Sequence, residues 1–173
     1  MRSFPSMLIG WLFGPPLRLR CKRRLWELGA EELAQRTLGG RRESGAYLLG
    51  RQLRDGSKEI LDFIFYDDVD PKALSSGIVT IRETAFPRLW EICRTRGYGV
   101  VADVHVHPGG YGQSESDSAS PVMPRPGHIA IIVPNFARGR PRPGSIGIYE
   151  FLGAGAWVEH SDVGHRFFRL EER

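Results

Sequence analysis

Two histidines one residue apart carry the strongest chemical signal in this sequence. The segment VADVHVHPGGYGQSESDSAS, residues 101–120, places His105 and His107 at alternate positions of an apolar run. Alternate residues of a β-strand point to the same face and lie about 7 Å apart along the strand. The two imidazole rings can therefore converge on one metal ion, and imidazole nitrogen is a preferred ligand of zinc.

A catalytic zinc ion takes three protein ligands, so a third ligand is expected close to the histidines. Pro108 ends the apolar run, and the glycines that follow it turn the chain sharply. Either Glu115 or Asp117 could then reach back to the two imidazoles. The alternative without a metal is a pair of half-buried strand histidines that hydrogen-bond to the backbone.

The same segment resembles the JAMM signature of the JAB/MPN-domain zinc metalloproteases. That signature is His-x-His-Pro, a short loop and Ser-x-x-Asp, and the residues that match it are His105, His107, Pro108, Ser114 and Asp117. The family also has a glutamate ahead of a glycine- and leucine-rich strand. The stretch ESGAYLLG at 43–50 resembles this block and makes Glu43 the candidate. Six residues separate His107 from Ser114, one fewer than is usual in the family.

The resemblance implies a fold and a set of roles. The fold is a mixed α/β (α+β) single JAB/MPN domain, which is cytidine-deaminase-like, with a curved mixed sheet packed by helices. One zinc ion per chain would be held by His105, His107 and Asp117. Glu43 would carry the proton, and Ser114 would stabilise the oxyanion of the tetrahedral intermediate. Ser-x-x-Asp is also a helix-capping pattern, and the capping role of Ser114 is compatible with the catalytic one.

The implied activity is that of a JAMM-type zinc metallopeptidase, a deubiquitinase-like hydrolase of the prokaryotic JAB type. It would cleave after the C-terminus of a ubiquitin-like protein, either in a precursor or in a conjugate, as part of a bacterial conjugation system such as those used in antiviral defence. The partners would be the C-terminal tail and the cognate conjugation enzymes. The alternatives are a non-catalytic MPN-type scaffold and a JAB protein that processes a sulfur-carrier protein. A link to DNA repair has only the sequence pI of about 9.4 in its favour.

Two further features are candidates for supporting roles. Asp103 shares the strand face of both histidines and could orient His105 from behind the metal, unless it is a solvated strand residue. The loop NFARGRPRPGS, residues 135–145, predicts a flap beside the active site in which Arg138, Arg140 and Arg142 meet an acidic partner surface. The alternatives are a solvated loop and a nucleic-acid contact, but no nucleic-acid-binding motif is present.

Alternating strand and helix signals surround these blocks and predict mixed α/β architecture. Helices are expected at 27–40 and 84–96, with Pro87 in the first turn of the second and Gly97 at its end. Strands are expected at 17–26, 44–54, 58–69, the start of 75–97, 98–108, 128–134, 145–160 as a hairpin, and 165–170.

The composition is that of an ordinary globular domain. The chain has 173 residues, 41% of them hydrophobic and 25% charged, and a formal net charge of +4. Cys21 and Cys93 form no disulfide framework, so a cytoplasmic location is expected. The apolar stretch within residues 1–16 is too short to span a membrane and predicts an N-terminal arm ahead of a domain at 17–173. Neither a membrane span nor a nucleic-acid partner is expected.

Overall fold

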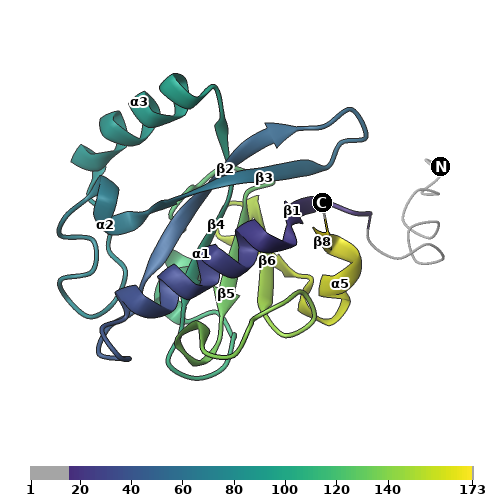
Figure 1. The fold of residues 1–173 in the computed structure, drawn as a ribbon. Helices are drawn as coiled ribbons and strands as arrows, with labels where there is room; N and C mark the ends of the chain where they lie inside the picture. Colours follow the sequence, from purple (N-terminus) through teal and green to yellow (C-terminus); the bar gives the residue numbers. More distant parts are fainter. Residues whose placement is uncertain (1–15, 173) are drawn as a thin grey trace, which may run out of the picture.

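The computed structural model describes residues 16–172, which form one curled, mixed β-sheet with helices against its faces (Figure 1). The predicted N-terminal arm lies outside the described residues except for Pro16. The strands are β1 (Leu19–Lys22), β2 (Gly45–Gln52), β3 (Lys58–Phe65), β4 (Gly99–Val106), β5 (Ile129–Val133), β6 (Gly147–Gly153), β7 (Ala156–Glu159) and β8 (Phe168–Glu171). Their order across the sheet is β7-β6-β5-β4-β2-β3-β1-β8.

Both parallel and antiparallel pairs occur in this sheet. β2 pairs antiparallel with β3 and with β4, and the β5–β6 and β6–β7 pairs are also antiparallel. β4 pairs parallel with β5, and β1 pairs parallel with β3 and with β8. The predicted mixed α/β class with a curved mixed sheet is therefore confirmed.

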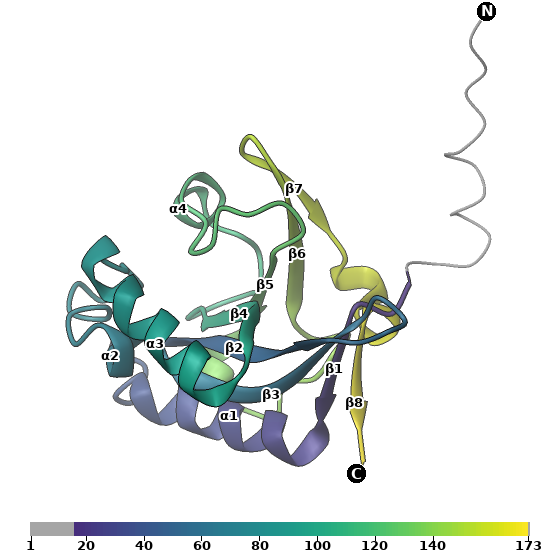
Figure 2. The ribbon, with the colours of Figure 1, turned by 90° about the horizontal axis from the view of Figure 1, so that it is seen from above.

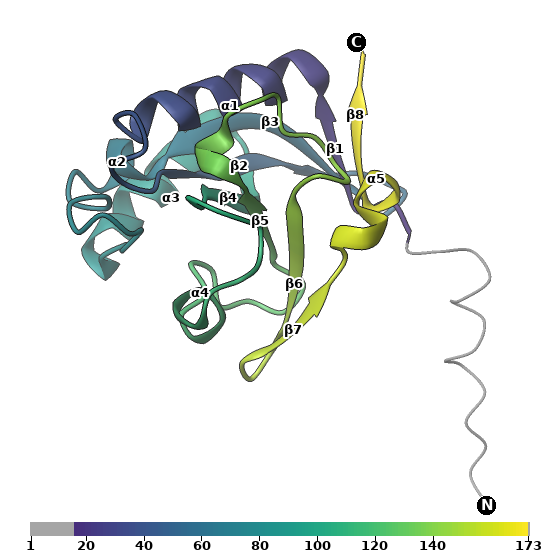
Figure 3. The ribbon, with the colours of Figure 1, turned by 90° about the horizontal axis from the view of Figure 1, so that it is seen from below.

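Helices cover the two faces of the sheet unequally. They are α1 (Arg23–Arg36), α2 (Tyr66–Val69), α3 (Phe86–Arg96), α4 (Glu115–Ala119) and α5 (Gly164–Phe167), with 3₁₀ turns η1 (Glu83–Ala85), η2 (Asn135–Ala137) and η3 (Ser161–Val163). Figures 2 and 3 show α1 lying along one face while α4 stands on the other side of β4 and β5. None of the described helices is long and apolar enough to cross a membrane.

The alternation of side chains along the strands creates two hydrophobic cores. Leu48 of β2 and Val104 of β4 join the core beneath α1, where Trp26 and Leu33 are buried. Tyr47 and Leu49 of β2 point the other way, into the core beneath α2 and α3. Because both faces are covered, β5 is apolar along its whole length, whereas β4 carries the polar residues Asp103 and His105 on one face.

Most predicted elements occur, and several differ from the prediction. The strand predicted at 58–69 ends at Phe65, where helix α2 begins, and the strand predicted at 165–170 begins at Phe168, after helix α5. Helix α1 begins at Arg23, so the strand predicted at 17–26 is confined to four residues. The strand predicted at the start of 75–97 is wrong. Its backbone amides donate instead to a loop carbonyl (Thr80 to Ala73, 2.9 Å) and to a carboxylate (Arg82 to Asp70, 3.1 Å). These local acceptors satisfy the amides that a neighbouring strand would otherwise bind.

Candidate metal centre

The side chains of His105, His107 and Asp117 meet at one point. The two Nε2 atoms of the histidines are 3.0 Å apart. Oδ1 of Asp117 lies 3.4 Å from Nε2 of His105, and Oδ2 lies 3.2 Å from Nε2 of His107. Both histidines are buried, at 6% and 9% exposure. The structure therefore brings together the three residues proposed as metal ligands from the sequence.

The donor set and its spacing fit a zinc ion. Zinc prefers imidazole nitrogen and carboxylate oxygen at about 2.0–2.2 Å, and the edge of a tetrahedron with such bonds is roughly 3.3 Å. The three separations of 3.0–3.4 Å between donor atoms are close to that edge. Three protein donors leave the fourth position of a tetrahedron open, as in catalytic rather than structural zinc sites.

Strand β4 positions both histidines from its backbone. Val104 and Val106 point into the core beneath α1, so the alternate residues His105 and His107 project from the opposite face. On one side of the strand, Gly45 of β2 is the register partner of His105. On the other side, the amide of His107 donates to the carbonyl of Val133 at 2.9 Å. The histidine backbone is thus held by strands on both sides.

A capping box at the start of α4 positions the carboxylate. The Ser114 hydroxyl accepts from the Asp117 amide at 3.1 Å, and Oδ2 of Asp117 accepts from the Ser114 amide at 2.8 Å. This reciprocal pair turns Asp117 toward the histidines and leaves Glu115 exposed in the first helical turn. The six-residue loop after His107 is therefore long enough to close the site.

The three ligand candidates also influence each other's charge. Burial acts to lower the pKa of His105, but the hydrogen bond and the charge of Asp117 outweigh it and the pKa is raised. Burial acts to raise the pKa of Asp117, but hydrogen bonds to both histidines hold that pKa well below its usual range. The carboxylate is therefore ionised at neutral pH, as a metal ligand must be.

Glu43 lies beside the cluster without belonging to it. It lies two residues before β2, and its amide donates to the Gly77 carbonyl at 2.8 Å. Its carboxylate accepts from the Val79 amide at 3.4 Å, and its charge contributes to raising the pKa of His105. The cluster of mutually close donor atoms contains His105, His107 and Asp117 only, among the residues the structure describes. This position suits a group that handles protons next to a metal.

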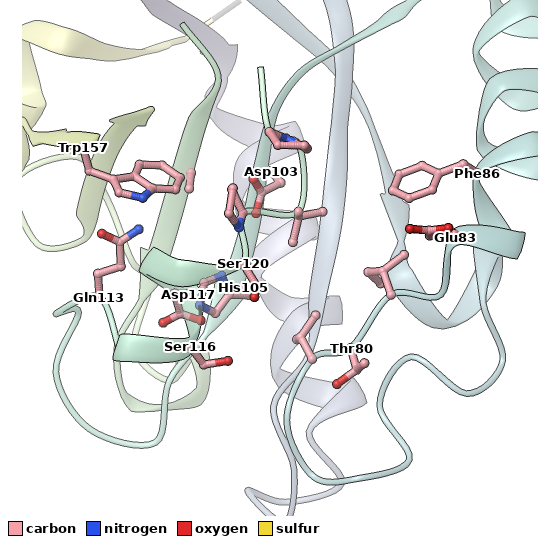
Figure 4. A pocket seen from close by; sticks show the side chains of 16 residues that line it. Thr80, Glu83, Phe86, Asp103, His105, Gln113, Ser116, Asp117, Ser120 and Trp157 are labelled. Atoms are coloured by element: carbon pink, nitrogen blue, oxygen red, sulfur yellow. Dashed lines mark ion pairs between the residues drawn. The ribbon is translucent and has the colours of Figure 1, made fainter. Parts of the chain in front are cut away.

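The cluster opens into a cleft of about 400 Å³. Figure 4 shows His105 and Asp103 between two walls, one that contains Thr80, Glu83 and Phe86 and one that contains Gln113 and Trp157. The indole Nε1 of Trp157 donates to the Ser118 carbonyl at 3.0 Å and so ties β7 to the α4 wall. The acidic side chains in the described lining are Glu83, which is exposed, Asp103, which is buried, and Asp117 of the cluster.

The surroundings of Asp103 differ from both interpretations of the sequence, which were a partner that orients His105 and a solvated strand residue. Asp103 is buried, and its Oδ1 lies 2.5 Å from Nε2 of His128 while its Oδ2 accepts from the Tyr66 hydroxyl at 2.9 Å. It is therefore neither a solvated residue nor hydrogen-bonded to His105. Burial raises the pKa of Tyr66, and the charge of Asp103 adds to this effect. The sequence carried no signal for His128, because the parallel pairing of β4 with β5 brings it to Asp103.

The arginine loop does not flank the cleft, which corrects the prediction for Arg138, Arg140 and Arg142. The loop packs along α1, on the sheet face opposite the histidines. The indole of Trp26 donates to the Pro141 carbonyl at 2.6 Å, and Arg138 donates to the Gly39 carbonyl at 3.0 Å. Together with α1 the loop lines a separate groove. A role for these arginines in binding a substrate at the histidine cluster is therefore not supported.

One wall of the cleft is fastened by a partly buried ion pair. The Asp70 carboxylate is buried and accepts from the Arg82 guanidinium, the Arg82 amide and the Lys72 amide. The Arg82 guanidinium holds the pKa of Asp70 well below its usual range. The pair secures the segment from Val79 to Arg82, which lines the same cleft as the candidate metal centre.

Asp70→Asn should lower stability in a pH-dependent way. The pKa of Asp70 in the folded protein lies below the ordinary value of 3.8. The ionised carboxylate therefore stabilises the fold above about pH 4, and this stabilisation is lost as the pH falls through the lower folded-state pKa. We expect a loss of about 1–2 kcal/mol at pH 7, since Arg82 is half exposed. Thermal unfolding of both proteins between pH 7 and 2 measures it. Asp162→Asn, which changes an exposed carboxylate, is the control. A loss of stability that did not depend on pH, or an equal loss in Asp162→Asn, would contradict this role of Asp70.

Fold and site together define a mixed α/β domain with a candidate three-ligand metal centre. No protein-family model matches the sequence. A solved structure of similar fold is that of protein DSY2949 from Desulfitobacterium hafniense, with a TM-score of 0.62 and 15% identity over 90% of this chain and 94% of that chain. A protein from Salinibacter ruber matches less well, with a TM-score of 0.47 and 16% identity over 79% of this chain and 82% of that chain. At this identity, the first likeness shows the fold alone.

Proposed function

We propose that this protein is a zinc-dependent peptidase or isopeptidase of the JAB/MPN type, acting in the cytoplasm on the C-terminal tail of a ubiquitin-like protein. The observation that carries the proposal is the convergence of His105, His107 and Asp117 at the base of a cleft, with Glu43 beside them. These residues have the order and the strand context of the JAMM signature. A scaffold that had lost catalysis would have no reason to keep the full donor set.

The residues around the candidate metal centre can supply the proton transfer and the oxyanion stabilisation that amide hydrolysis requires. When bound, zinc lowers the pKa of a coordinated water toward about 7. Glu43 accepts the proton from the attacking water and passes it to the leaving amine. The Ser114 oxygen accepts from the Asp117 amide, which leaves the hydroxyl proton free to donate to the developing oxyanion. Capping and catalysis therefore use different parts of the same hydroxyl group.

The wall segment from Val79 to Arg82 supports binding of an extended tail. It belongs to no strand, Arg82 has extended backbone angles, and Ile81 has no backbone hydrogen-bond partner among the described residues. A peptide lying in the cleft could pair with these free groups as an added strand. The Asp70–Arg82 pair would keep the wall in place for that pairing.

The charge of the cleft limits which tails it can accept. Glu83 is the exposed charged residue of the described lining, whereas Asp103 is buried and Asp117 belongs to the candidate metal cluster, so beside Glu83 a basic tail residue is favoured over an acidic one. This preference is the reverse of the acidic partner suggested by the arginine loop. The same charge preference would hold for the tail of a ubiquitin-like conjugation protein and for the tail of a sulfur-carrier protein. Both kinds of substrate are therefore included in the cleavage assay.

A panel of β-grasp proteins with C-terminal extensions tests the proposal. We expect cleavage after the last residue of the mature tail, with a lower KM for tails that contain Arg than for the same tails with Glu. Glu83→Gln should reduce this preference, whereas Glu91→Gln on α3, outside the cleft lining, should not. High salt should weaken the preference because exposed charges are screened. Failure of the zinc-loaded protein to cut any fusion would reject the substrate class.

A further inference from the structure

The arginine loop begins with an unusual backbone turn. Asn135, Phe136 and Ala137 have φ angles of 53°, 54° and 58°, so three consecutive residues with a Cβ adopt the left-handed conformation. This conformation is disfavoured for L-residues and is seen mostly for single residues. Such strain persists only where the surrounding structure enforces it, and it often marks a functional constraint.

The turn directs two successive amides at the end of the metal-binding strand. The Phe136 amide donates to the His107 carbonyl at 2.8 Å, and the Asn135 amide donates to the Gly109 carbonyl at 2.9 Å. In a regular strand only alternate amides face the same neighbour. In a continued parallel ladder the Asn135 amide would face the His107 carbonyl. The left-handed turn gives that carbonyl the Phe136 amide instead and moves the Asn135 amide on to the Gly109 carbonyl, so that both carbonyls are bound.

The ring of Phe136 anchors this turn. It packs against the core beneath α1 and lies over Gly40, four residues beyond the C-terminal end of α1. A Cβ at Gly40 would lie 3.1 Å from the ring, closer than a comfortable contact. In Figure 3 the green turn lies directly beside α1. Phe136 thus connects two elements: its ring packs near the end of α1, and its amide donates to the carbonyl at the end of β4.

We propose that Phe136 is a positioning residue for the metal centre. Its ring holds the left-handed turn in place, and the amides of the turn fix the carbonyls of His107 and Gly109. This keeps the end of β4 and the start of the metal loop in the geometry that binds the ion. The inference rests on the metal centre of the proposed function but not on the nature of the substrate.

Phe136→Ala tests the proposal with readouts other than activity. The dissociation constant for zinc, measured by competition with a chromophoric chelator, should rise about tenfold, the size expected when a group that orients a ligand is lost. Amide hydrogen exchange at Asn135 and Phe136 should accelerate in the metal-free protein. Phe136→Leu keeps an apolar anchor and should restore affinity to within about threefold of the wild type.

Leu170→Ala is the matched control. Leu170 is partly buried against the same core but lies on β8, at the edge of the sheet away from β4. It should lower the melting temperature without changing zinc affinity. Equal loss of affinity in both alanine variants, or none in Phe136→Ala, would overturn the proposal. If Phe136→Ala does not fold, Phe136→Gly removes the ring while easing the left-handed backbone, and it is compared with Leu170→Ala in the same way.

The exchange measurement separates this inference from the proposed function. A wild type that binds no zinc would reject the metal centre, while unchanged amide exchange at Asn135 and Phe136 in the variant would reject the anchoring role by itself. Zinc binding with an unaltered Phe136→Ala dissociation constant would reject the positioning role and leave the metal centre intact.

Discussion

Glu43→Gln should reduce hydrolysis by about 10³-fold and leave about one zinc ion bound per chain, because general base catalysis contributes roughly 10²–10⁴. The amide cannot accept a proton from water, yet it has nearly the shape of the carboxylate and can still accept from the Val79 amide. Glu43 lies outside the cluster of ligand candidates, so the zinc content should not change. Elemental analysis and single-turnover cleavage of a tail fusion measure the two effects.

Glu115→Gln is the control for that substitution. Glu115 is an exposed carboxylate in the first turn of α4, two residues from Asp117, and its loss should leave both zinc content and rate unchanged. If Glu43→Gln releases the metal, then Glu43 is a ligand and the division of roles is wrong. If the rate survives with zinc in place, another group takes the proton.

His107→Ala should remove zinc and with it all metal-dependent hydrolysis. Only His105 and Asp117 would then remain of the three-residue cluster, and two protein donors hold zinc poorly. We expect the zinc content to fall from about one ion per chain to near zero after dialysis against a mild chelator. The fold should persist, because the strand backbone of β4 stays paired with β2 and β5.

His165→Ala provides the comparison for metal loss. His165 is an exposed histidine on α5, away from β4, and its removal should leave the zinc content at the wild-type value. Far-UV circular dichroism of all three proteins checks that the fold is retained. Equal zinc in His107→Ala and the wild type would reject the assignment of the centre.

Local patterns in the sequence were sufficient for much of the fold. The apolar run at 128–134 became β5, and the glycines at 153 and 155 closed the predicted hairpin between β6 and β7. Gly97 ends α3 in the left-handed conformation, with a φ of 69°. The segment at 75–82 misled the prediction because its β-branched residues resemble a strand. Its backbone partners, a loop carbonyl and two carboxylates, lie elsewhere in the chain.

What the sequence determined by itself was the chemistry that depends on near neighbours. His105 and His107 share a face because they are two residues apart on a strand, and Ser114 with Asp117 forms a capping box because they are three apart. Only the tertiary structure decided which distant groups meet them. The pairing of β4 with β2 places Glu43 close to the two histidines of β4. The pairing of β4 with β5 places His128 within hydrogen-bond distance of Asp103. The left-handed turn at Asn135–Ala137 directs the arginine loop to the sheet face opposite the histidines. The positive φ angles of these three residues set the direction of the chain there, and their residue types do not predict such angles.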